Sequence, residues 1–130
     1  MSDKIIRLGG SHAGNAGSTK NLVEYAGKHS GRVFIVVSAV PEMLRYIRSS
    51  VIDAHTIKTE LIYEKLNAFY SECIGKKPSE AYRKLVDQVT GIIRGIGLIG
   101  DYSEALKDQV LSFGEKLTAE IFRQQLAKSG

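Results

Sequence analysis

Two apolar runs decide the fold of this chain: Ile5-Ile6-Arg7-Leu8, which stops at Gly9-Gly10, and Arg32-Val33-Phe34-Ile35-Val36-Val37-Ser38. The second run is rich in β-branched residues and almost wholly apolar, a pattern typical of a parallel strand covered on both faces of an α/β sheet. Between the two runs lie a loop rich in Gly, Ser and Asn and a helical stretch from about Ser18 or Thr19 to His29. Strand, loop, helix and strand predict a parallel βαβ unit.

The rest of the chain favours helices over strands. Pro41 suits the first turn of a helix, and Ser79 is a candidate helix cap. Apolar residues then recur at helical spacing in three stretches, from Ile57 to Cys73, from Tyr82 to Ile96 and from Leu106 to about Lys128. A two-stranded parallel sheet is incomplete by itself. Either further strands come from another chain or region, or the helices bury most of the core.

Length and composition are those of an ordinary soluble globular protein. The chain has 130 residues, 43% of them hydrophobic and 25% charged, so we expect a single domain over residues 1–130. Its one cysteine, Cys73, favours a reducing, cytoplasmic setting. The net charge of +4 is scattered among acidic residues, and the longest apolar run, Val33 to Val37, is too short to cross a membrane. We therefore expect neither nucleic acid nor membrane as a partner.

The loop from Gly9 to Ser18 is the strongest candidate for chemistry. It connects a strand to a helix, where exposed backbone N–H groups can approach a phosphate closely. It lacks both the Gly-Lys-Ser/Thr triplet of a Walker loop and the glycine spacing of a dinucleotide fingerprint. Arg7 either extends a cation over this loop or is an ordinary surface arginine, and His12 is a lone loop histidine. No spacing typical of a metal site or a nucleophilic triad occurs, so we expect no protein-held metal.

Three segments of the sequence follow a recognisable order. Arg7-Leu8-Gly9-Gly10-Ser11-His12 is similar to the motif K-F-G-G-T-S, and Val36-Val37-Ser38-Ala39 is similar to V-V-S-A. The stretch from Asp108 to Ala119 is similar to D-x-[VIL]-x-S-x-G-E-x-x-S-[AT]. Together they resemble the N-terminal part of aspartokinase, in the amino-acid kinase family. The resemblance implies an α/β, partial amino-acid kinase (carbamate kinase-like) fold with a short parallel sheet and a helix-rich remainder.

Aspartokinases transfer the γ-phosphoryl group of Mg-ATP to the β-carboxylate of aspartate, the first step toward lysine, threonine and methionine. Such a transfer needs positioning and neutralisation of charge by backbone N–H groups, a cation and Mg²⁺. The resemblance implies that Gly9, Gly10 and Ser11 bind the phosphoryl group, and that Arg7 occupies the position of the catalytic Lys. ATP and Mg²⁺ would be the cofactors, with neither expected to be tightly bound, and ATP and aspartate the partners.

On the amino-acid side, the resemblance implies that Ser38 and Glu115 contact the substrate. The sequence also departs from the motifs: Lys is replaced by Arg7, and Val40 begins a stretch that lacks the family's Gly-[IV]-Thr. The later substrate motif and the nucleotide-binding half would lie beyond Gly130. We therefore expect a segment that is inactive alone, and the alternative is a diverged, non-catalytic binding or assembly module. Exposed sheet edges further predict self-association.

Overall fold

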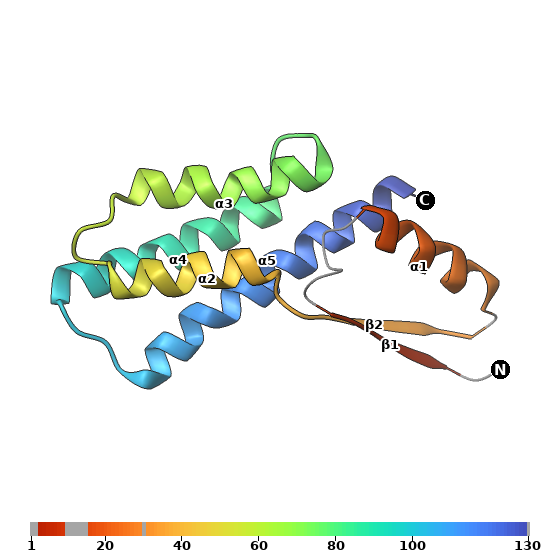
Figure 1. Ribbon diagram of the computed structural model, residues 1–130, viewed down its shortest axis with the longest axis horizontal. Coiled ribbons are helices and arrows are strands. Elements are labelled where there is room, and N and C mark those ends of the chain that lie inside the picture. The colour runs from red at the N-terminus through yellow and green to blue at the C-terminus, as the bar shows by residue number, and fades with distance from the viewer. Residues whose placement is uncertain (1–2, 10–15, 30, 130) are drawn as a thin grey trace.

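The structure is a computed structural model that describes residues 3–9, 16–29 and 31–129. Its elements in chain order are β1 (Lys4–Leu8), α1 (Ala16–Lys28), β2 (Val33–Val37), α2 (Pro41–Ile52), α3 (Thr59–Ile74), α4 (Glu80–Ile99) and α5 (Glu104–Ser129). The two strands pair in parallel, with Lys4 opposite Val33 and Leu8 opposite Val37. This arrangement confirms the predicted parallel βαβ unit, although its helix begins slightly earlier than expected. The helices α2 to α5 form a bundle beside it (Figure 1).

Local signals in the sequence set most of the helix ends. Pro41 occupies the first turn of α2, and the Ser79 hydroxyl accepts a hydrogen bond from the Tyr82 N–H at 3.2 Å, so the predicted cap of α4 is confirmed. Gly75 and Gly100 follow α3 and α4 with φ angles of 78° and 82°, the left-handed conformation that favours glycine at a helix end.

The bundle encloses the main hydrophobic core. Tyr82 is completely buried, its ring lies 4.9 Å from that of Tyr70 between centroids, and its hydroxyl donates to the carbonyl oxygen of Leu66. The other residues of this core come from α2, α3, α4 and α5 and include Met43, Ile47, Ile62, Val86, Val89, Ile93, Val110, Leu117 and Ile121. Of the two possibilities that the sequence left open, the described residues therefore show the second: helices bury most of the core.

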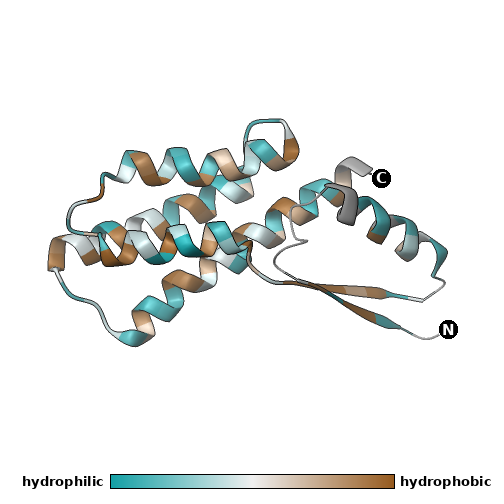
Figure 2. Cartoon of the chain, in the orientation of Figure 1, coloured by the Kyte–Doolittle hydropathy of each residue, from teal (hydrophilic) through white to brown (hydrophobic). Residues whose placement is uncertain are grey.

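The sheet is covered on one face only. Leu8 of β1, Leu22 of α1 and Phe122 of α5 form a second, small core on that face. On the opposite face the side chains of Ile5, Phe34 and Val36 are 76%, 49% and 54% exposed. The prediction that the second strand is covered on both faces is therefore wrong for residues 3–9, 16–29 and 31–129. Continuously apolar strands are typical where a helical layer covers each side of the sheet, and here α1 and α5 cover only one side (Figures 1 and 2).

Candidate functional site

The carboxyl ends of β1 and β2 meet at one edge of the sheet. Leu8 and Val37 are opposite each other at this edge, and the Ser38 N–H donates a hydrogen bond to the carbonyl oxygen of Leu8 at 3.1 Å. Gly9 follows directly, and a methyl group at its Cα would meet no atom within 4 Å. Because ligands of open α/β sheets bind beyond the carboxyl ends of the strands, this edge is the candidate functional site.

One turn of α5 packs against the chain just after β2. A Cβ atom at Gly114 would lie 3.3 Å from the Cβ of Ala39, so the missing side chain allows this close approach. The hydroxyl of buried Thr118 accepts a hydrogen bond from the Val40 N–H at 3.2 Å and donates to the Gly114 carbonyl oxygen at 2.7 Å. These contacts fix the segment from Gly114 to Thr118 beside the strand ends.

Glu115 is thereby brought to the same edge. It follows Gly114 directly, and it lies two helical turns before Phe122 on the same side of α5. Phe122 packs on the covered face of the sheet, so Glu115 lies on that side but beyond the strand ends. Its side chain is exposed and forms no ion pair with any other described residue. The carboxylate is therefore available to a ligand.

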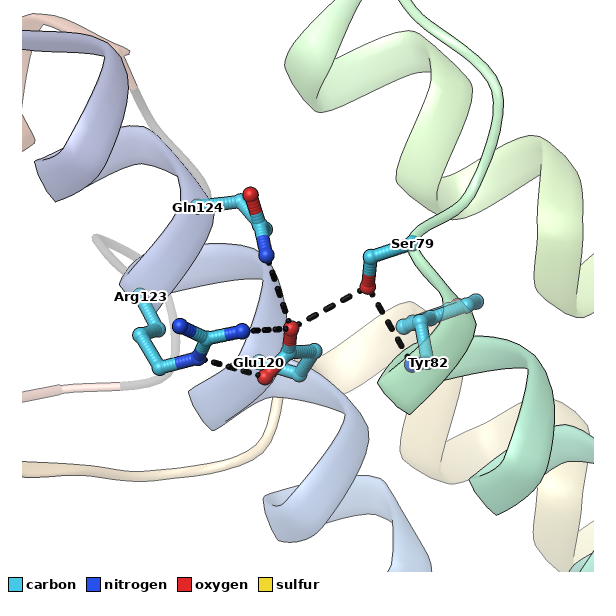
Figure 3. A network of polar contacts seen from close by, with 5 residues as sticks. All are labelled: Ser79, Tyr82, Glu120, Arg123 and Gln124. Atoms are coloured by element: carbon cyan, nitrogen blue, oxygen red, sulfur yellow. Dashed lines mark hydrogen bonds and ion pairs between the residues drawn. The ribbon is translucent and has the colours of Figure 1, made fainter.

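A second glutamate on α5 is fully engaged in contacts within the protein (Figure 3). The Glu120 carboxylate accepts hydrogen bonds from Arg123 at 2.7 and 2.8 Å, from Gln124 at 3.0 Å and from the Ser79 hydroxyl at 3.1 Å. Hydrogen bonding from Arg123 is the main reason that the pKa of Glu120 is lowered, and burial opposes this shift. Glu120 thus ties α5 to the cap of α4.

The predicted site residues are only partly brought together. Gly9 and half-buried Ser38 lie at the carboxyl edge, and exposed Glu115 follows Gly114, which packs against Ala39 just after β2. Arg7 is exposed opposite Val36, on the uncovered face of the sheet one residue before the end of β1. Gly10 and Ser11, the other two predicted phosphate-binding residues, lie outside the described residues, as does His12.

Sequence reasoning assigned no role to Thr118, which fixes α5 against Val40. A signal for it was available: Gly114 and Thr118 are four residues apart, so they share one face of the helix. A small residue followed by a hydroxyl at this spacing is suited to close packing against a strand end.

Two further properties concern the described part of the chain. Within it, no group of three or more His, Cys, Asp or Glu side chains is arranged to hold a metal ion. None of its helices is long and apolar enough to cross a membrane.

No protein-family model matches the sequence, and no curated protein matches it. A solved structure does match: E. coli aspartokinase III in complex with aspartate and ADP, in the R-state. The superposition has a TM-score of 0.71 at 18% sequence identity and covers 98% of this chain. The fold is that of an aspartokinase fragment. This chain spans 29% of the aspartokinase III chain, so less than a third of that enzyme has a counterpart here.

Proposed function

We propose that this chain forms the phosphoryl and amino-acid side of an aspartokinase-like site, which transfers phosphate from Mg-ATP to the β-carboxylate of aspartate. The observation that carries the proposal is the meeting of three segments at one edge: Leu8-Gly9, Ser38-Ala39 and Gly114-Glu115. These segments are far apart in the sequence, and each belongs to one of the three motifs that resemble aspartokinase. Their convergence is what a shared binding site requires.

The phosphoryl side rests on Gly9 and Arg7. Open space around Gly9 lets a phosphate oxygen approach the backbone, and Gly10 and Ser11 are the next proposed contacts. Arg7 would neutralise charge from the uncovered face of the sheet. Its planar guanidinium donates to two phosphate oxygens at once, whereas the Lys of the family motif presents a single point charge.

The amino-acid side rests on Glu115 and Ser38. A carboxylate without an ion pair suits the ammonium group of aspartate, and Glu115 has such a carboxylate at the edge. The Ser38 hydroxyl would complete the substrate contacts from the end of β2. Aspartate bound there would have its β-carboxylate free to face the phosphoryl group near Gly9.

The described residues do not fit a protein-held Mg²⁺ ion. Glu115 is the one carboxylate among the described residues assigned to the site, and they contain no metal-binding cluster. Magnesium therefore enters as part of the substrate, Mg-ATP. Because the chain supplies only one side of the site, we expect it to form no aspartyl phosphate when it is alone with Mg-ATP and aspartate.

A second function, a non-catalytic binding or assembly module, is favoured by two observations. Arg7 lies on the uncovered sheet face, and α2 begins at Pro41 directly after the strand-end residues Ser38 to Val40. This short connection contains no substrate-binding Thr of the Gly-[IV]-Thr type. In such a module the edge would hold an anion, and no transfer would follow.

The test is an NMR titration of the whole chain with Mg-ADP, with inorganic phosphate and with aspartate. We expect shifts of the Gly9, Ser38 and Glu115 amides, and an aspartate Kd at least about tenfold weaker in Glu115→Gln. Glu64→Gln, which neutralises an exposed glutamate on α3, is the matched control and should bind like the unmodified chain. A folded chain without shifts at the edge would overturn both functions.

Arg7→Lys separates the two functions. Restoring the ammonium group of the family motif should strengthen the response to phosphate if the chain belongs to a kinase site. If the chain is a non-catalytic module, the response should stay the same. Formation of aspartyl phosphate by the isolated chain would refute its proposed inactivity but not its site.

A further inference from the structure

The end of the bundle farthest from the sheet carries an unusual concentration of exposed apolar side chains. Leu98 and Ile99, at the end of α4, are 83% and 79% exposed, and Ile52, at the end of α2, is 60% exposed. We call this end, with the adjoining Ala54 and His55, the bundle tip. Figure 1 shows it at the opposite end of the molecule from β1 and β2, and Figure 2 shows its hydrophobic colouring. Concentrations of this kind mark interaction surfaces.

The shape of the bundle tip is fixed by its backbone. Gly97 lies so close to the turn after α2 that a methyl group on it would collide with the carbonyl oxygen of Ala54. Gly100, in the left-handed conformation, donates its N–H to the carbonyl oxygen of Ile96 at 2.8 Å and ends α4 there. Leu98 and Ile99 therefore project from an ordered helix end, so a partner need not order them on binding.

Two hollows flank Ala54 and His55 at the bundle tip. The larger one, of about 390 Å³, is lined by Ile52, Ile96 and Tyr102 among others. The smaller one, of about 190 Å³, includes Leu98 and Arg94 in its wall. Projecting apolar residues beside hollows of mixed lining on one surface form a pattern that a two-fold axis can make self-complementary.

The charges around the hollows also favour a second copy of the chain. Exposed Asp53 and Asp101 adjoin residues that line the larger hollow, whereas Arg94 lines the smaller one. A two-fold axis that brings the larger hollow of one copy against the smaller hollow of its partner pairs these opposite charges. The bundle tip thus carries both signs of charge, as a self-complementary interface requires, and Arg94 is held in place by a hydrogen bond to the Thr59 hydroxyl at 3.2 Å.

The uncovered sheet face, the other exposed apolar surface, lacks this property. It carries Arg7 and Arg32, and Asp3 is already paired with Arg32 at 2.9 Å. Two copies facing each other there would bring cations together, a cost that the bundle tip avoids.

We propose that the bundle tip is the interface of a two-fold homodimer, in which Leu98 of each copy enters the larger hollow of its partner. The dimer would leave the carboxyl edge of both sheets open, because the edge and the tip are at opposite ends of the molecule (Figure 1). The interface is thus independent of the proposed phosphotransfer function. It also replaces the sheet edge as the surface through which the predicted self-association occurs.

Sedimentation equilibrium of the whole chain over a range of concentrations tests the proposal. We expect a dimer with a Kd on the order of micromolar, and at least a tenfold weaker Kd for Leu98→Gln and for Ile99→Gln. Ile5→Gln, the same type of change at a 76% exposed residue on the sheet face, should leave the Kd unchanged. In NMR spectra the amides of Ile52, Leu98 and Ile99 should shift with concentration.

Three results would overturn the dimer. A chain that stays monomeric at about 100 µM has no such interface at the affinity proposed. An unchanged Kd in both tip variants, with circular dichroism showing them folded, would exclude the bundle tip. Loss of the dimer in Ile5→Gln would assign the contact to the sheet face instead.

Discussion

The bundle and the strand end differ in how completely they are enclosed. In the bundle, residues such as Ile62, Leu66 and Tyr82 are shielded from solvent on every side. In the small core at the strand end, Leu8 and Leu22 are each 9% exposed. One face of the sheet there is uncovered. The most completely buried part of this molecule and the part that forms its candidate site are therefore different regions. Ligand-binding segments are commonly drawn from the less stable parts of a protein.

The largest effect should come from a cavity in the bundle. Leu66→Ala removes a completely buried side chain, and we expect a loss of about 3 kcal/mol in the free energy of unfolding. Leu8→Ala, the matched change at the strand end, should cost about 1 kcal/mol and loosen mainly β1. Urea denaturation followed by circular dichroism suits a chain without Trp. Equal losses in the two variants would contradict the expected difference in stability between the regions. They would indicate that both regions unfold as one cooperative unit.

A single added methyl group tests how closely α4 packs against the turn after α2. Gly97→Ala places that group against the carbonyl oxygen of Ala54, so we expect a loss of about 2 kcal/mol. Gly95→Ala is the matched control, because a Cβ there meets nothing within 4 Å. Removing backbone freedom at this helical position should stabilise the chain by about 0.5 kcal/mol. Thermal melts of both variants measure the contrast, and a neutral Gly97→Ala would contradict the close approach.

Glu120 joins the two regions, because its carboxylate ties α5 to the cap of α4. We expect Glu120→Gln to cost about 1 to 2 kcal/mol at pH 7, since it weakens hydrogen bonds to a charged group. The pKa of Glu120 is lower in the folded chain, so the unfolded chain takes up the proton first as the pH falls. The contribution is therefore complete above the ordinary glutamate pKa of about 4.3 and is lost at lower pH. Stability curves that keep a constant difference down to pH 2 would contradict this role.

The positions of the bundle helices could largely be predicted from the sequence, because the signals for helix formation and helix ends are local. Helical periodicity and the Ser79 cap correctly predicted where α3 and α4 form. The role of Gly97 near the end of α4 depends instead on its close approach to Ala54 of another segment.

The parts that could not be predicted depend on contacts between distant residues. The composition of β2 was consistent with cover on both faces, but only the position of the other elements decides whether Phe34 is covered. Likewise, the hydrogen bond between Val40 and Thr118 spans 78 residues and exists only because α5 docks at the strand end. The motifs predicted that Gly9, Ser38 and Glu115 belong to one site, and the docking of α5 places Gly114, the neighbour of Glu115, against Ala39.

The smallest effect on stability is expected at the strand end itself. Glu115→Gln changes an exposed side chain without an ion pair to any described residue, so the free energy of unfolding should change by less than about 0.5 kcal/mol. Urea denaturation checks this expectation. A loss as large as that of Glu120→Gln would mean that Glu115 is a structural residue rather than a ligand-binding one.

Amide hydrogen exchange of the whole chain, with and without Mg-ADP plus aspartate, tests the central claim most directly. If the strand ends and α5 form one binding edge, ligand should slow exchange at Gly9, at Ser38 and Ala39, and around Glu115, and should leave Leu98 and Ile99 at the bundle tip unchanged. Exchange that stays the same at the edge, or slows only at the bundle tip, would contradict the claim that this edge is the site.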